Sequence, residues 1–137
     1  MLRRIHHVGI VVRSLEEGYR FYRDTLGLPL IKEATVQDQG VRAALLLAGE
    51  SEIELLEPID PNGGVAKFLE KRGEGLHHVC VEVEDLVATL AELKAKGAQL
   101  IDETPKIGAG GAKVAFVHPK GAHGVLTELR QGRPTRE

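Results

Sequence analysis

Two stretches of the chain repeat one pattern of polar and apolar positions. IHHVGIVV at residues 5–12 and LHHVCVEV at residues 76–83 each place a histidine doublet before an apolar run. Short runs rich in β-branched residues are typical of β-strands. Each run is followed by a segment with apolar residues at helical spacing, which begins after a capping residue, Ser14 or Asp85, and ends at a glycine. The pattern therefore predicts a strand followed by a helix in both places.

Three further strands are predicted after each helix. They cover residues 28–36, 41–49, 51–58, 98–103, 112–119 and 124–131, and a short helix is expected within 63–73. The two halves align with each other, His6 with His77 and Glu54 with Glu128, so the chain is an internal repeat of β-α-β-β-β units. We predict an α+β fold in which two such modules, at about 5–58 and 76–130, pair around a pseudo-twofold axis. They form one domain over residues 1–131, followed by a tail at 132–137.

Strand parity separates the two histidines of each doublet. Successive side chains of a strand point to opposite faces of its sheet. His6 and His77 share the apolar face that should pack against a helix, where we expect core histidines with a satisfied ring nitrogen. His7 and His78 should point away from the helices.

The last strand of each module carries a glutamate among aliphatic residues. Glu54 and Glu128 occupy equivalent positions, and a lone buried carboxylate is costly. Two histidines and two glutamates, one pair from each repeat, would satisfy one another around a divalent metal, because imidazole and carboxylate ligands suit zinc and its neighbours. The alternative is two separate His–Glu contacts on exposed strands.

Composition sets broad limits on the class of protein. The chain has 137 residues and a formal net charge of −2, so nothing favours a nucleic acid or an anionic membrane as partner. Cys80 is the single cysteine, which fits a reducing compartment and a cytoplasmic location. No apolar run is long enough for a membrane span, and the N-terminus does not read as a signal peptide.

Several motifs in order resemble the vicinal oxygen chelate (glyoxalase/bleomycin resistance/dioxygenase) superfamily and, within it, the methylmalonyl-CoA epimerase family. They are HHVGI, DQGVRAALLLAGESEIELLEP, GLHHVCVEVEDL, PKIGAGGAKVAFVHPK and HGVLTEL. The resemblance implies a homodimer of subunits that each fold into an open, cup-shaped barrel with one divalent metal ion (Co, Zn, Mn or Ni) in the cup. In this family a His, a Glu or Gln, a His and a Glu bind the metal. These positions here are His7, Glu54, His78 and Glu128.

The resemblance also implies the reaction. The substrate would be methylmalonyl-CoA, whose (2R) and (2S) forms interconvert when a proton leaves C2 and another returns on the opposite face, through a metal-stabilised enolate. The resemblance nominates Glu128 and Asp38 as the acid–base groups. Many family members have glutamate at the position of Asp38, and aspartate is one methylene shorter. A plain turn residue is the other interpretation of Asp38, because Asp and Gly are favoured in turns.

Three other functions are open to a chain with this pattern. A glyoxalase I-type lactoylglutathione lyase uses a similar His/Glu/His/Glu site, and the segments DQGV and PKIGAGG favour the epimerase instead. A ring-cleaving dioxygenase of the superfamily would leave one of the four positions without a ligand. A metal-free module that binds a small ligand would have lost the ligands, and all four are present.

Overall fold

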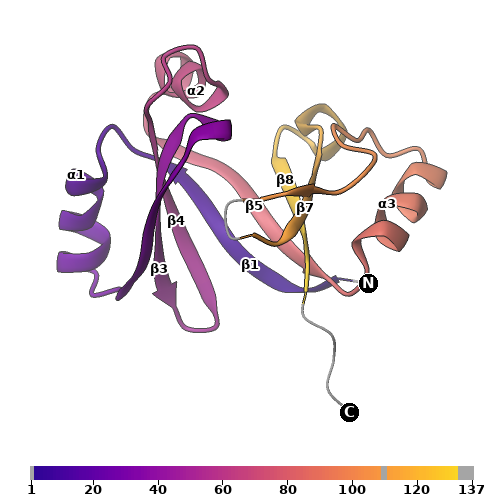
Figure 1. Ribbon diagram of the computed structural model, residues 1–137, viewed down its shortest axis with the longest axis horizontal. Coiled ribbons are helices and arrows are strands. Elements are labelled where there is room, and N and C mark those ends of the chain that lie inside the picture. The colour runs from indigo at the N-terminus through magenta and orange to yellow at the C-terminus, as the bar shows by residue number, and fades with distance from the viewer. Residues whose placement is uncertain (1, 109–110, 133–137) are drawn as a thin grey trace. The chain divides into compact units, whose positions relative to one another are not determined.

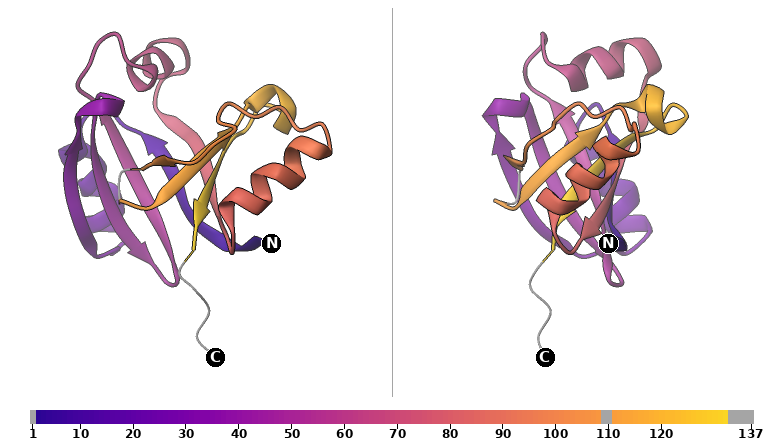
Figure 2. Two further views of the ribbon diagram at one scale, coloured as in Figure 1. Left: turned by 45° about the vertical axis from the view of Figure 1, so that its right-hand side comes forward. Right: turned by 90° about the vertical axis from the view of Figure 1, so that its right-hand side faces the viewer.

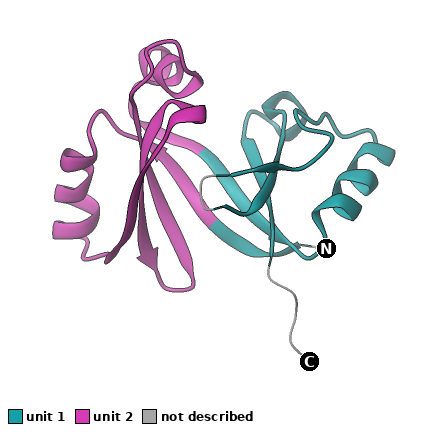
Figure 3. Cartoon of the chain, in the orientation of Figure 1, with its two compact units in different colours: residues 1–6, 78–137 teal, residues 7–77 magenta. Residues whose placement is uncertain are grey.

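A computed structural model of the protein describes residues 2–108 and 111–132 (Figure 1). The chain divides into two compact units, coloured separately in Figure 3. Residues 7–77, drawn in magenta and labelled unit 2 in Figure 3, contain the first module and are here called the first unit. The second unit consists of the described residues among 1–6 and 78–137. Both boundaries fall inside a histidine doublet, so the strands that carry the doublets pass from one unit into the other.

The first unit has a four-stranded sheet in the order β2-β3-β4-β1. Its elements are β1 (Leu2–Val11), whose first residues belong to the second unit, α1 (Leu15–Tyr19), a π-helical turn η1 (Arg20–Thr25), β2 (Leu30–Val36), a 3₁₀ turn η2 (Gln37–Gln39), β3 (Val41–Ala48), β4 (Ser51–Pro58) and α2 (Gly64–Arg72). Strand β1 runs parallel to β4, and the other neighbours are antiparallel. Helix α1 lies against β3 and β4 (Figure 1).

The second unit repeats this arrangement with the strand order β5-β8-β7-β6. Its elements are β5 (Gly75–Val83), α3 (Leu86–Ala95), β6 (Lys106–Ile107), β7 (Lys113–Val117), a 3₁₀ turn η3 (Pro119–Ala122) and β8 (Leu126–Gln131). Strand β5 runs parallel to β8, and α3 packs on β7 and β8 (Figure 2). The two β-α-β-β-β modules expected from the repeat are therefore present.

Helices α1 and α3 begin where the sequence predicts. The Ser14 hydroxyl accepts a hydrogen bond from the Glu17 amide, and the Asp85 carboxylate accepts one from the Ala88 amide, each at 3.1 Å. Such caps satisfy amides that have no partner within the first helical turn.

The first helix ends in a wider turn than the α-helical spacing of its apolar residues predicts. The amide of Leu26 donates to the carbonyl of Phe21, five residues back, which is the bond pattern of a π-helix. The Thr25 hydroxyl also bonds to the Arg20 carbonyl, at 2.9 Å. The widened turn takes Leu26 off the stripe of Leu15 and Tyr19, and its side chain is 54% exposed.

The expected strand at 98–103 is wrong. Only Leu100 pairs there, through an isolated bridge to Val117, and β6 forms farther along the chain. The amides of Ile101 and Asp102 both donate to the carbonyl of Phe116, while the Asp102 carboxylate accepts from the Phe116 amide at 2.9 Å. The Asp102 carboxylate thus takes the place of a backbone carbonyl as the acceptor, and regular strand pairing stops there.

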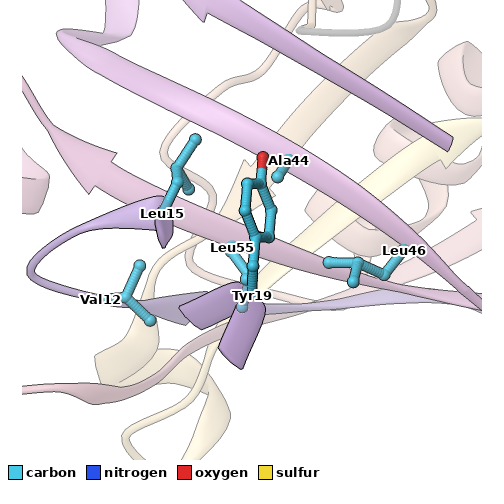
Figure 4. Packing of buried hydrophobic residues seen from close by; sticks show 6 residues of the cluster. All are labelled: Val12, Leu15, Tyr19, Ala44, Leu46 and Leu55. Carbon is cyan, nitrogen blue, oxygen red and sulfur yellow. The ribbon is translucent and has the colours of Figure 1, made fainter. Parts of the chain in front are cut away.

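Each unit buries its helix against its own sheet. In the first unit, Leu15 and Tyr19 of the helix pack on Leu55 and its neighbours (Figure 4). In the second, Leu86 and Leu90 pack on Leu129. These contacts confirm the parity assigned to the strands.

A further apolar cluster occupies the opposite face of the first unit, next to α2. Its buried members are Val11, Val41, Ala43, Leu56 and Val65. No helix among the described residues is both long and apolar enough to cross a lipid bilayer. Apart from Gly132, the predicted tail at 132–137 lies outside the described residues.

Candidate metal and acid–base site

In the first unit His7 and Glu54 meet, on the face away from α1. Nε2 of His7 lies 3.5 Å from Oε1 of Glu54, and the two residues are 6% and 7% exposed. The register of the parallel pair β1–β4 produces this contact. Glu54 is the partner of Gly9, two residues beyond His7 on the same face. Because Gly9 has no side chain, the space beside Glu54 is open to the His7 ring.

The second unit contains the equivalent pair. Nε2 of His78 lies 3.2 Å from Oε1 of Glu128, and the two residues are 6% and 8% exposed. Here Glu128 is the register partner of Cys80, a small, fully buried residue two positions beyond His78. The Phe116 ring stands edge-on to His78 at 6.2 Å. The same diagonal across a parallel strand pair thus places a histidine beside a glutamate in both modules.

The first histidine of each doublet has a different environment from the one expected. His6 is half-buried, and its Nε2 lies 3.0 Å from Nη1 of Arg130. His77 is also half-buried and stands edge-on to the Phe68 ring of α2 at 5.0 Å. Neither belongs to the buried core clusters of the described residues. The expectation that His6 and His77 are core residues is therefore corrected. They are half-buried and make these contacts at the points where β1 and β5 pass from one unit into the other.

Asp38 lies on an exposed turn of the first unit. It is the middle residue of η2, which joins β2 to β3. The turn is held in place by Gly40, whose carbonyl accepts hydrogen bonds from the amides of Ile59 and Asp60 at 2.8 and 3.2 Å. Gly40 has a φ of 65°, and a Cβ there would lie 2.7 Å from the Cβ of Asp60, so any other residue would be strained at this position. Asp38 is thus on a fixed turn.

The donor set of the two pairs suits a divalent transition metal. Each pair offers one imidazole nitrogen and one carboxylate oxygen, side by side and shielded from water. Nitrogen and oxygen donors of this kind bind zinc, cobalt, nickel and manganese. The described structure brings His7 beside Glu54 and His78 beside Glu128, and it places Asp38 on a turn.

Three residues with structural roles at the ends of the last strands were missed by the sequence patterns. Arg130 shares a face with Glu128, which the sequence shows, but its partner is 124 positions away. Glu57 accepts from the Leu15 amide at 2.8 Å, and Gln131 accepts from the Leu86 amide at 2.7 Å. The repeat alignment could have found this second pair, because Glu57 and Gln131 follow the two aligned glutamates by three residues.

Comparison with known proteins agrees with this arrangement. Residues 6–116 match the family model of the Glyoxalase/Bleomycin resistance protein/Dioxygenase superfamily. An ethylmalonyl-CoA/methylmalonyl-CoA epimerase of Cereibacter sphaeroides is 41% identical over 96% of this chain and 99% of its own length. The chain belongs to this superfamily and, within it, to the methylmalonyl-CoA epimerase family.

Solved structures extend the similarity to the fold. The crystal structure of methylmalonyl-CoA epimerase from Mycobacterium tuberculosis is 38% identical, with a TM-score of 0.91 over 97% of this chain and 90% of that one. A methylmalonyl-CoA epimerase in complex with methylmalonyl-CoA and NH4+ is also 38% identical, with a TM-score of 0.91 over 96% of each chain. The predicted α+β fold of two β-α-β-β-β modules is confirmed.

The lyases of the superfamily are more distant. A lactoylglutathione lyase of Arabidopsis thaliana is 27% identical over 98% of this chain, which spans 46% of that protein.

Proposed function

We propose that this chain epimerises methylmalonyl-CoA at C2. The observation that carries the proposal is the full-length similarity, at 38–41% identity, to epimerases of this substrate, one of them in complex with methylmalonyl-CoA. C2 lies between a thioester and a carboxylate, so its proton is acidic enough for a carboxylate base held in position. The two faces of C2 then need two acid–base functions.

The proposal includes one divalent metal ion per subunit, with His7, Glu54, His78 and Glu128 as its ligands. The buried Nε2–Oε1 pair in each unit supports this, because an imidazole and a carboxylate at equivalent positions of two repeats form a symmetric donor set. When bound, the ion supplies Lewis-acid polarisation of the thioester and carboxylate oxygens. The identity of the metal is left as Co, Zn, Mn or Ni.

Glu128 and Asp38 are the proposed acid–base groups. Glu128 is held against His78 and is shielded from water, which fixes the direction of its carboxylate. Asp38 is exposed but sits on the turn that Gly40 pins to the end of β4. One group removes the proton from one face of C2, and the other delivers a proton to the opposite face.

A lactoylglutathione lyase is the second candidate on the ligand set alone. The distances within each His–Glu pair do not separate the two reactions. The comparisons favour the epimerase, because the lyase is 27% identical whereas the named epimerases reach 38–41%.

The decisive experiment is exchange of the C2 proton of methylmalonyl-CoA in D2O, followed by NMR, with and without a chelator. We expect enzyme-dependent exchange that stops on chelation and returns with added Co2+. The absence of exchange, together with turnover of a glutathione hemithioacetal, would instead assign the lyase activity.

We also propose a cytoplasmic homodimer. Symmetric dimers are the commonest soluble oligomers, and the resemblance implies one. The chain has a single cysteine, Cys80, which is buried, and this agrees with a reducing compartment. Light scattering should give twice the mass of the chain at micromolar concentration, and a monomer mass across that range would contradict the dimer.

A further inference from the structure

Arg130 and His6 connect the strands on which two of the proposed ligands lie. Nη1 of Arg130 is 3.0 Å from Nε2 of His6, and both residues belong to the second unit. A guanidinium keeps its protons and has no acceptor, so Arg130 must donate and Nε2 of His6 must accept. The proton of the neutral His6 ring is then on Nδ1.

The neighbours of this pair give the contact its meaning. Arg130 lies two residues beyond Glu128 on the same face of β8. His6 directly precedes His7 in β1. A single hydrogen bond therefore joins the strand of the first proposed ligand to the strand of the last, within one residue of His7 and two of Glu128.

The carboxylate across the strand pair from Arg130 already has cationic partners. Glu82 is the register partner of Arg130 and the nearest carboxylate across the strand pair. Its oxygens are engaged by the N-terminal residues, at 2.8 Å from Nε of Arg4 and 3.7 Å from Nη1 of Arg3. The same ion pairs hold the segment that precedes His6 against β5, so the imidazole is presented to Arg130 by an anchored strand.

The second doublet, His77 and His78, is anchored differently. His77 packs against Phe68, and the position equivalent to Arg130 is Leu56, a member of the apolar cluster next to α2. In both modules the first histidine is held by its own contact, and the second is paired with a glutamate. The contact made by the first histidine thereby limits how far the second can move along the strand.

We propose that Arg130 and His6 are a positioning pair for the metal site. The pair holds the residue directly before His7 against the strand of Glu128, and it takes no part in the chemistry. This inference rests on the proposed function, because it assumes that His7 and Glu128 are ligands of one ion.

The test measures Co2+ affinity by calorimetry at fixed pH, without substrate. Arg130→Met and His6→Phe should each weaken Co2+ binding about 10–100-fold, the usual cost of losing a partner that orients metal ligands. The Co2+ affinity of the double variant should be at most about threefold below that of the weaker-binding single variant. Both changes remove the same interaction, so their effects should not add. His6→Gln keeps an acceptor oxygen and should bind within about threefold of the parent, a rescue that loss of ring packing would not give.

Arg23→Met is the matched control. Arg23 makes an exposed ion pair with Asp24, so the variant has the same change of charge and should bind Co2+ as the parent does. Circular dichroism melts identify any variant that fails to fold; if Arg130→Met fails, the two His6 variants decide. Parent-like affinity in Arg130→Met and His6→Phe would overturn the positioning pair alone. If the parent does not bind Co2+, and His78→Ala gives the same result, the metal site itself is overturned.

Discussion

The two modules keep one arrangement in different surroundings. The His–Glu distance is 3.5 Å in the first unit and 3.2 Å in the second, and each glutamate faces a small residue on the neighbouring parallel strand. In each unit a side chain at the end of the last strand accepts from the first amide of the helix, Glu57 in one and Gln131 in the other. The register of parallel strands is what the repeats share.

The two modules differ in the residues that follow each His–Glu pair on the same face of the sheet. In the first unit that face is apolar and lies next to α2, with Val11 and Leu56 at its centre. In the second unit the equivalent positions are Glu82 and Arg130, which bind the arginines and the histidine of the N-terminal segment. A parallel strand pair can thus present the same two side chains whether apolar packing or charges support it.

The largest expected effect distinguishes the two glutamates. Glu128→Gln should lower turnover about 10²–10⁴-fold, because Glu128 is proposed as both a ligand and an acid–base group. Glu54→Gln should cost less than about tenfold, since Glu54 is proposed only as a ligand and the family accepts glutamine there. Steady-state kinetics at saturating Co2+ make the comparison. Equal losses in the two variants would remove the special role of Glu128.

The next effect concerns Asp38, on the turn between β2 and β3 of the first unit. Asp38→Asn should retain the fold and bound metal but lower turnover about 10²–10⁴-fold. The change removes a charge and little else, so elemental analysis and a melt make the loss interpretable. Deuterium incorporation that starts from only one epimer would show that each base serves its own face. A near-native rate would make Asp38 a turn residue.

The two helix–sheet cores should respond alike. Leu55→Ala and Leu129→Ala remove side chains that are 0% and 3% exposed at equivalent strand positions. Each should lower the free energy of unfolding by about 2–5 kcal/mol, since a buried leucine leaves a cavity. Urea denaturation with the slope compared between variants provides the measurement. A loss under about 1 kcal/mol at either site would mean that its core relaxes around the change.

The smallest effect belongs to a polar network found in the first unit. The Tyr19 hydroxyl donates to Glu33, and Arg42 lies 3.0 Å from the same carboxylate. These two interactions lower the pKa of Glu33, and burial together with Glu33 raises the pKa of Tyr19. A lowered carboxylate pKa contributes stability above the unfolded-state value and loses it as pH falls through the folded value.

Glu33→Gln should therefore lower the free energy of unfolding by at most about 1 kcal/mol near neutral pH, because the Glu33 side chain is 38% exposed and water screens its charge. The difference from the parent should shrink below about pH 4, near the ordinary pKa of glutamate. Urea melts from pH 3 to 7 measure it. Glu103→Gln is the control: Glu103 aligns with Glu33 but pairs with the exposed Lys94. A pH-independent difference would point to packing instead of charge.

Much of the fold could be predicted because local rules govern it. The caps at Ser14 and Asp85 and the parity of β1 and β5 follow from patterns within a few residues. The failures arose where a side chain or a widened turn replaced a regular backbone bond. Asp102 interrupts the expected strand, and the π turn after Tyr19 exposes Leu26.

The sequence by itself determined that His7, Glu54, His78 and Glu128 hold equivalent places in two repeats, because alternation along a strand fixes the face of every side chain. Tertiary structure alone decided which groups they and their neighbours meet. The register of β1 on β4 and of β5 on β8 joined each histidine to a glutamate 47 or 50 residues away. Packing set His6 against Arg130 across 124 positions and His77 against Phe68. Such contacts depend on how strands and helices settle against one another, and no local pattern contains that information.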